Sequence, residues 1–208
     1  MDHPRLETHD LSAIIVAGGR SRRMGRPKPW LPLADVPLIA HVAARVRPLV
    51  HEVVVVAAAE QDLPSLAARI VRDREPGLGP LPALALGLET VTTPYAFALG
   101  CDTPFVVRSV LRLLIEEVAG ADAAIPVWQD RLQPLVALYH RRMASGIGVL
   151  AAAGERRLHS VASLPGVRLV PAERLRARDP GGASFRTLNT PEEYAAALDA
   201  WTRDGPAD

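Results

Sequence analysis

The apolar residues of this chain follow two alternating spacings. Short segments, most of them almost continuously apolar, are typical of buried strands and lie at 11–17, 52–58, 69–73, 95–100, 121–127, 133–139 and 167–170. Segments with apolar residues at helical spacing lie between and after them, at 36–47, 83–92, 106–119, 141–153 and 191–201. This alternation predicts an α/β fold with three layers, in which a mostly parallel sheet carries helices on both faces.

The length of 208 residues fits one domain, and no linker or repeat divides the chain. We expect an N-terminal extension at 1–10, a single domain at 11–201 and a C-terminal tail at 202–208. In such sheets ligands bind beyond the carboxyl ends of the strands. The loops after Ala17, Asp73 and Gly100 are therefore the places to search for function.

Charge and apolar run lengths exclude several classes of protein. With 24 Lys and Arg against 23 Asp and Glu, the chain lacks the basic excess of a general nucleic-acid binder. The longest apolar run, Val53–Ala59, is far shorter than the roughly 18 residues of a membrane span, and residues 1–10 do not resemble a signal peptide. A single cysteine excludes an internal disulfide and any multi-cysteine metal site. We expect a soluble, cytoplasmic protein with neither nucleic acid nor membrane as a partner.

Three residue types occur once each. Lys28 is the only lysine beside 23 arginines, Asn189 is the only asparagine and Cys101 is the only cysteine. Single occurrences arise by chance, or they mark positions where one chemistry is needed. Their places relative to the motifs decide between these explanations.

The first motif is a glycine-rich loop that follows the strand at 11–17. It begins at Gly18-Gly19 and carries Arg22, Arg23 and Lys28. Glycines let backbone N–H groups approach phosphate oxygens, and the cations suit a polyphosphate. The spacing is neither that of a P-loop nor G-x-G-x-x-G. The alternative is a solvated basic surface loop.

The second motif is Cys101-Asp102-Thr103-Pro104, at the end of the strand at 95–100. A carboxylate at this place is suited to Mg²⁺, which prefers one or two carboxylates with substrate phosphates and water. The alternative for Asp102 is the N-cap of the next helix. For Cys101, a small packed side chain is the better interpretation, because no histidine base is evident beside it.

Together the motifs resemble those of the molybdenum cofactor guanylyltransferases. The pattern A-G-G-x-x-x-R-M-G-x-x-K is followed by Asp73 and Gly79-Pro80-Leu81, then C-D-T-P, then N-T-P-E from Asn189, and the likeness covers residues 11–198. The resemblance implies a Rossmann-like nucleotidyltransferase fold. It also places all three single-occurrence residues on or beside motifs.

The resemblance implies two groups of site residues. The nucleotide side comprises Val16, Ala17, Gly18, Gly19, Lys28, Asp73, Gly79 and Asp102. Among these, Asp73 and Gly79 belong to the guanine pocket, and Asp102 is the Mg²⁺ ligand. The acceptor side comprises Gln133, Arg156, Arg157 and Asn189. The turn at Asn189 closes over the site, and an N-cap at Thr190 is the alternative for this turn.

The implied reaction transfers GMP from GTP to the phosphate of molybdopterin and releases pyrophosphate. That phosphate is largely anionic at pH 7, so no Ser, Cys or His nucleophile is required. Lys28, Arg23 and Asp102 with Mg²⁺ are then the catalytic groups, which stabilise charge on the phosphates. GTP and molybdopterin are the expected partners, together with proteins that make or receive the molybdenum cofactor. Cytidylyl transfer, another phosphorylated acceptor and a non-catalytic carrier are the alternatives.

One departure from the family pattern concerns Lys28. The family commonly has Asp-Lys where this chain has Pro27-Lys28. The sequence therefore predicts that Lys28 lacks an acidic partner.

Overall fold

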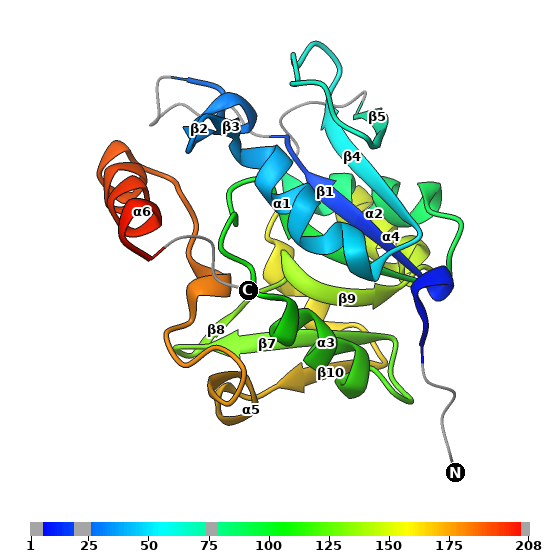
Figure 1. The fold of residues 1–208 in the computed structure, drawn as a ribbon. Helices are drawn as coiled ribbons and strands as arrows, with labels where there is room; N and C mark the ends of the chain where they lie inside the picture. The colour runs from blue at the N-terminus through cyan, green and yellow to red at the C-terminus, as the bar shows by residue number, and fades with distance from the viewer. Residues whose placement is uncertain (1–5, 19–25, 74–78, 205–208) are drawn as a thin grey trace.

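The structure of the protein is a computed structural model that describes residues 6–18, 26–73 and 79–204. A mixed sheet forms its centre (Figure 1). The strand order is β10-β7-β9-β6-β1-β4-β5, and β8 pairs with β7. The strands are β1 (Leu11–Val16), β4 (Glu52–Ala58), β5 (Arg69–Asp73), β6 (Tyr95–Gly100), β7 (Ala123–Trp128), β8 (Arg131–Leu132), β9 (Val136–His140) and β10 (Val167–Val170). The strands β6, β1, β4 and β5 run parallel, β10 is parallel to β7, and β9 is antiparallel to both its neighbours. The prediction of a mostly parallel sheet is confirmed.

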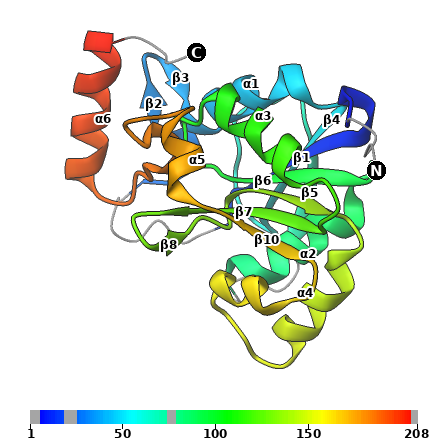
Figure 2. The same ribbon diagram turned by 90° about the horizontal axis from the view of Figure 1, so that it is seen from below.

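Helices cover both faces of this sheet (Figure 2). On one face lie α1 (Leu38–Val46) and α3 (Arg108–Glu117), and on the other lie α2 (Pro80–Thr90) and α4 (Met143–Ala152). Side chains of β1 alternate between the two cores: Ile15 belongs to the first, and Ile14 and Val16 belong to the second. The three-layer prediction is confirmed, because helices and apolar cores lie on both faces of the sheet. A strand buried on both faces has apolar residues at every position, which is why its sequence reads as a continuous apolar run.

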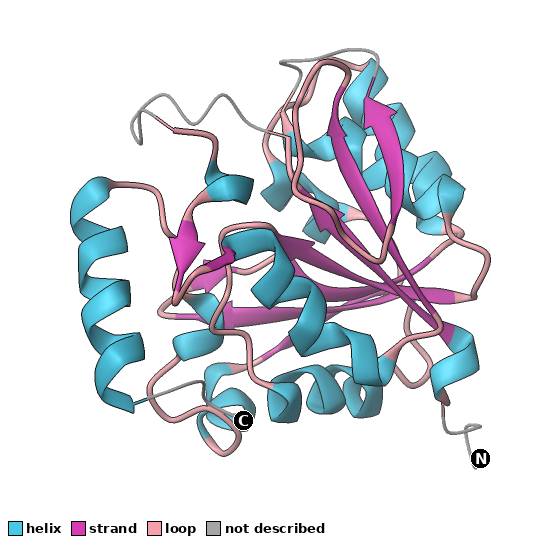
Figure 3. Cartoon of the chain, turned by 45° about the horizontal axis from the view of Figure 1, so that its top comes forward, coloured by secondary structure: helices cyan, strands magenta, loops and turns pink. Residues whose placement is uncertain are grey.

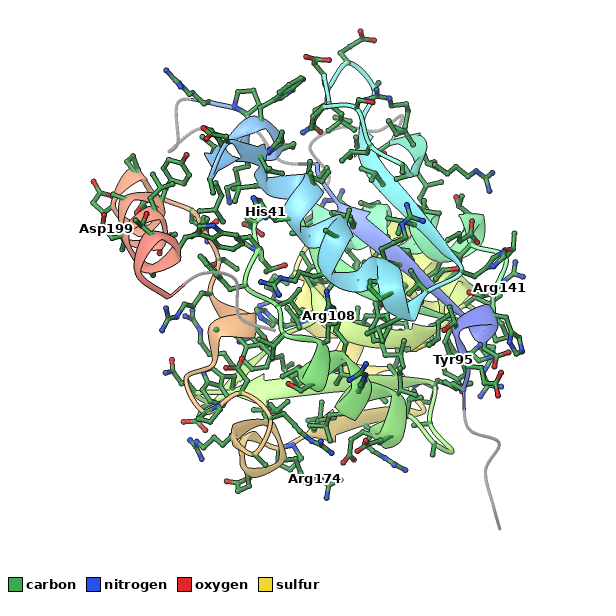
Figure 4. All side chains as sticks on the ribbon, in the orientation of Figure 1. His41, Tyr95, Arg108, Arg141, Arg174 and Asp199 are labelled. Atoms are coloured by element: carbon green, nitrogen blue, oxygen red, sulfur yellow. The ribbon has the colours of Figure 1, made fainter. Side chains whose placement is uncertain are left out.

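A smaller third cluster joins the C-terminus to the segment after the glycine-rich loop. The helix α6 (Pro191–Asp204) lies beside the hairpin of β2 (Pro32–Leu33) and β3 (Val36–Pro37), as Figure 1 shows. The buried members are Leu31, Leu33, Leu38, Leu188 and Ala197. His41, labelled in Figure 4, lies on α1 toward α6, and its ring meets that of Trp201 edge-on with centroids 4.7 Å apart.

Short elements complete the chain, as the colouring by secondary structure in Figure 3 shows. The remaining helix is α5 (Ala172–Arg176), and the 3₁₀ turns are η1 (Thr8–Asp10), η2 (Lys28–Trp30), η3 (Arg47–Leu49), η4 (Leu158–Ser163) and η5 (Ala183–Phe185). No helix in the described ranges is long and apolar enough to cross a membrane.

Several predicted boundaries shift for local reasons. The helix predicted at 36–47 begins at Leu38, because Val36–Pro37 pairs with β2 across a turn in which Ala34 and Asp35 have φ of 49° and 64°. The strand predicted at 133–139 begins at Val136, because the N–H of Val136 donates to the carbonyl of Gln133 in a turn. The last helix continues past Trp201 to Asp204.

The contact between α2 and β1 leads to a test of the core. A Cβ at Gly87 of α2 would lie 2.5 Å from Cγ2 of Ile14, which is fully buried. Alanine in a helix is ordinarily about 1 kcal/mol better than glycine, but overpacking a core costs about 1–3 kcal/mol. We expect Gly87→Ala to lower the free energy of unfolding, measured by urea denaturation.

The matched control is Gly148→Ala in α4, where an added Cβ meets nothing within 4 Å. This change is expected to leave the free energy of unfolding unchanged or raise it by up to about 1 kcal/mol. Equal effects of the two substitutions would contradict the close packing of α2 on β1.

Candidate active site

The ammonium of Lys28 is the centre of a polar cluster between three distant parts of the chain. Lys28 opens η2, and its Nζ donates to Oδ2 of Asp102 at 2.7 Å and to Oδ1 of Asn189 at 2.6 Å. The side chains of Lys28 and Asp102 are only 16% and 17% exposed. The prediction that Lys28 lacks an acidic partner is wrong, since Asp102 supplies the carboxylate from 74 residues away.

Asp102 is held in a tight turn immediately after β6. Oγ1 of Thr103 donates to the carbonyl of Gly100 at 2.8 Å. A Cβ at Gly100 would lie 2.6 Å from Oδ1 of Asp102, so the absence of a side chain there makes room for the carboxylate. The next helix, α3, has Val107 as its N-cap, which removes the capping alternative for Asp102.

Cys101 is 6% exposed and packs in the core beneath this turn. Burial and the neighbouring Asp102 carboxylate both raise the pKa of its thiol, and burial is the larger cause. The thiol therefore stays protonated at neutral pH and is a poor nucleophile. This supports the interpretation of Cys101 as a small packed side chain.

The turn at Asn189 both caps a helix and reaches the site. Oγ1 of Thr190 accepts the N–H of Glu193 at 3.2 Å, while Oε2 of Glu193 accepts the N–H groups of Asn189 at 2.6 Å and Thr190 at 3.1 Å. This is a capping box at the start of α6. The N–H of Leu188 donates to the carbonyl of Asp102 at 3.2 Å. Capping thus fixes the turn, and the side chain of Asn189 is left to contact Lys28.

The end of β1 is closed by backbone and side-chain bonds. The N–H of Ala17 donates to the carbonyl of Val56 at 2.8 Å, and Nε2 of Gln61 donates to the carbonyl of Ala17 at 2.9 Å. Gly18 is exposed, and a Cβ on it would meet nothing within 4 Å. The sequence reasoning missed Gln61, because a side chain that binds a backbone carbonyl belongs to no motif. Gly19 and Arg23, predicted at this loop, lie outside the described residues.

Asp73 and Gly79 flank residues 74–78, which are outside the described ranges. Asp73 ends the edge strand β5 and lines a groove of about 880 Å³ between β5, α2 and α4. Gly79 is the N-cap of α2 with φ of 89°, a conformation that favours glycine, and a Cβ there would lie 3.2 Å from the carbonyl oxygen of Arg156. The predicted nucleotide and acceptor segments therefore approach each other at Gly79, with little room for a side chain between them.

The predicted acceptor arginines lie on a turn that is organised by Glu155. Its Oε1 accepts the N–H groups of Arg156 and Arg157, each at 2.8 Å, and the side chain of Arg157 remains 83% exposed. The hydrogen bond from the Arg157 N–H is the largest cause that lowers the pKa of Glu155 to about 2, with Ser160 and the Arg156 N–H also contributing. The sequence reasoning missed Glu155, whose partners are chiefly backbone groups.

Gln133 lies beside β7, two residues before Leu135, which is bonded to the end of β6. Its N–H donates to the carbonyl of Pro126 at 2.9 Å, and the carbonyl of Leu135 accepts the N–H of Gly100 at 3.1 Å. The segment that follows β8 therefore reaches the end of β6, two residues before Asp102. Of the predicted residues, Lys28, Asp102 and Asn189 are joined by hydrogen bonds, and Gly79 lies close to the backbone of Arg156.

The donor set at Asp102 fits one kind of metal site. In the part of the chain that the structure describes, no group of three His, Cys, Asp or Glu side chains could hold a metal ion. A cation at Asp102 would have one protein carboxylate, with the other positions left to substrate phosphates and water. Mg²⁺ is commonly bound in this way.

The lowered pKa of Glu155 leads to a pH-dependent test. Because its folded-state pKa lies below the ordinary 4.5, its contribution to stability is complete above about pH 4.5 and is lost as the pH falls toward 2. We expect the difference in free energy of unfolding between wild type and Glu155→Gln to be constant from pH 7 to 5 and to shrink below that. A difference that is unchanged at pH 3.5 would show that the carboxylate charge does not hold this turn.

Comparison with known proteins places this geometry in a family. The family model of the MobA-like NTP transferase domain matches residues 13–169. A protein of Chloroflexus aggregans named probable molybdenum cofactor guanylyltransferase is 37% identical over 190 residues, covering 88% of this chain and 91% of the relative. One of the same name from Mycobacterium bovis is 34% identical over 174 residues, covering 80% and 87%.

Solved structures agree with this assignment. The crystal structure of molybdopterin-guanine dinucleotide biosynthesis protein A from Archaeoglobus fulgidus is similar with a TM-score of 0.79 and 26% identity, over 92% of this chain and 99% of that one. A 2-C-methyl-D-erythritol 4-phosphate cytidylyltransferase from Thermus thermophilus, 19% identical with a TM-score of 0.68 over 93% and 98%, shares the fold. The chain belongs to the family of MobA-like NTP transferase domains and is a nucleotidyltransferase.

Proposed function

We propose that this enzyme transfers GMP from GTP to the terminal phosphate of molybdopterin and releases pyrophosphate, forming the guanine dinucleotide cofactor. The observation that carries the proposal is the convergence of Lys28, Asp102 and Asn189 at the carboxyl end of β6. Relatives with similarity over most of the chain are named for guanylyl transfer, which supports the choice of nucleotide and acceptor.

The chemistry requires positioning and charge stabilisation rather than a protein nucleophile. The phosphate monoester of the acceptor is largely dianionic at pH 7 and attacks the α-phosphorus of GTP. The bond from the α-phosphorus to the bridging oxygen breaks, and its electrons leave with pyrophosphate. The buried, protonated thiol of Cys101 takes no part in this step.

Lys28, Asp102 and Arg23 are the proposed catalytic residues. The ammonium of Lys28 would neutralise charge that develops on the α-phosphate and on the leaving pyrophosphate, and the guanidinium of Arg23 would do the same. Asp102 would hold Mg²⁺ through its carboxylate. When bound, that cation supplies positive charge to the phosphate oxygens.

The two substrates are assigned to adjoining segments. We place the nucleotide against Val16, Ala17, Gly18 and Gly19 at the end of β1, with guanine toward Asp73 and Gly79. The acceptor phosphate is assigned to the turn of Arg156 and Arg157, with Gln133 and Asn189 toward the catalytic cluster. The close approach of Gly79 to the backbone of Arg156 supports adjoining sites for the two substrates.

The deciding experiment measures pyrophosphate release with molybdopterin and Mg²⁺ while GTP is compared with CTP, ATP and UTP. We expect kcat/KM for GTP to exceed that for each other nucleotide by at least about tenfold, which corresponds to about 1.4 kcal/mol. A preference for CTP would overturn the guanylyl assignment. GTP binding without pyrophosphate release would overturn the proposed transfer to molybdopterin.

The catalytic assignment is tested by Lys28→Ala and Asp102→Ala. Each removes one charged partner near the reacting phosphates, so turnover should fall by about 100-fold or more. The loss in free energy of unfolding should be only about 1.5–3 kcal/mol, the contribution of a hydrogen bond to a charged group. Turnover and urea denaturation are measured on the same preparations. A variant whose lost activity is accounted for by its unfolded fraction would contradict a catalytic role.

The space at Gly100 provides a second test of the site. An added Cβ in Gly100→Ala would displace the carboxylate of Asp102, whose Oδ1 would otherwise lie 2.6 Å away. Rotation of that side chain relieves the clash but breaks its hydrogen bond to Lys28, so the free energy of unfolding should fall by about 1.5–3 kcal/mol while turnover falls by at least about tenfold. Gly181→Ala, which meets nothing within 4 Å, is the matched control and should retain both properties. Full turnover in Gly100→Ala would exclude a precisely placed Asp102.

A further inference from the structure

The ammonium of Lys28 neutralises the carboxylate that is proposed to hold the metal. Nζ lies 2.7 Å from Oδ2 of Asp102, and the pair is shielded from water, with side chains 16% and 17% exposed. Mg²⁺ binds oxygen at about 2.0–2.1 Å and requires charge to offset its loss of water. An ammonium in contact with Oδ2 and a divalent cation on the same oxygen compete for one negative charge.

Asn189 holds the ammonium in this position. Its Oδ1 accepts from Nζ of Lys28 at 2.6 Å, and its Nδ2 donates to Oγ1 of Thr187 at 2.7 Å. Because the amide nitrogen is bound to Thr187, the amide oxygen faces Lys28. The N–H of Asn189 is fixed by Glu193 at 2.6 Å, so the backbone beneath this side chain is also restrained.

The charge balance changes when phosphates arrive. A polyphosphate brings several negative charges that attract the Lys28 ammonium away from Asp102. Asp102 is then left with an uncompensated, largely buried charge, which is costly unless another cation replaces the ammonium. Phosphate binding and metal binding are therefore coupled through the position of one side chain.

We infer that Asn189 is a positioning residue that keeps Lys28 on Asp102 in the nucleotide-free enzyme, so that a divalent cation gains Asp102 only after phosphates have drawn Lys28 away. This inference rests on the proposed roles of Asp102 and Lys28. It adds to that function an order of binding, phosphates before the divalent cation, and it assigns to Asn189 the task of holding Lys28. By linkage, removing the ammonium by mutation should raise the affinity of Asp102 for a divalent cation, as its displacement by phosphates does.

The first experiment measures Mn²⁺ binding by electron paramagnetic resonance, without nucleotide, in wild type, Lys28→Met and Arg26→Met. We expect Lys28→Met to bind Mn²⁺ at least tenfold more tightly than wild type, within the usual range of coupling between two ligands. Arg26 is an exposed cation two residues away and serves as the matched charge control, with an expected change of less than twofold.

Two further variants locate the effect. Lys28→Met combined with Asp102→Asn should lose the added Mn²⁺ affinity, because the carboxylate is gone. Asn189→Ala should tighten Mn²⁺ binding several-fold, because Lys28 loses the amide oxygen that helps to hold it on Asp102. Equal Mn²⁺ affinity in wild type and Lys28→Met, or an equal gain in Arg26→Met, would overturn the inference.

The composition of the chain allows a second experiment on the wild-type protein. Lysine labelled with ¹³C at Cε gives one side-chain signal, because Lys28 is the only lysine. We expect this signal to shift on addition of tripolyphosphate and to remain unchanged with millimolar Mg²⁺ alone. A shift with Mg²⁺ alone that equals the shift with tripolyphosphate would overturn the order of binding, whether or not the variants fold.

These measurements separate the inference from the proposed function. Mn²⁺, Mg²⁺ and tripolyphosphate contain neither guanine nor pterin, so the outcome does not depend on nucleotide preference. Absence of guanylyl transfer would contradict the proposed function and leave the exchange of cations standing. Unchanged Mn²⁺ affinity in an active guanylyltransferase would contradict only the inference.

Discussion

The contact of the Lys28 ammonium with Asp102 and Asn189 joins three segments that share no sequence neighbourhood. Asp102 reaches it because β1 and β6 are adjacent parallel strands, so the loops that follow them leave the sheet side by side. Asn189 reaches it because Leu188 is bonded to the backbone of Asp102. The rest of the fold has to hold these three segments at fixed positions relative to one another, since an ammonium attracts its partners strongly only at hydrogen-bond distance.

The third apolar cluster holds two of these three segments in place. Leu31 and Leu33 follow Lys28 along the chain, Leu188 precedes Asn189, and all three are buried together with residues of α6. Burial of these leucines restrains the backbone on which Lys28 and Asn189 stand, because they lie one to five residues away along the chain. The C-terminal helix is therefore a structural part of the site, and its Glu193 holds the backbone of Asn189 in place.

Sequence reasoning succeeded where the determining pattern is local. Strands buried on both faces appear as apolar runs, and the loops after β1 and β6 carry recognisable motifs. It missed the β2–β3 hairpin, because two-residue strands and left-handed Ala34 and Asp35 leave no periodicity. It also missed the acidic partner of Lys28, because the residue before the lysine says nothing about a carboxylate 74 positions away.

The close approach of Gly79 to the carbonyl of Arg156 limits which residues fit at position 79. With the nucleotide assigned to one side of this contact and the acceptor to the other, a bulkier residue at position 79 moves both binding surfaces together, because its neighbour is backbone and cannot rotate away. A substitution at position 79 is therefore expected to change the Michaelis constants of both proposed substrates together.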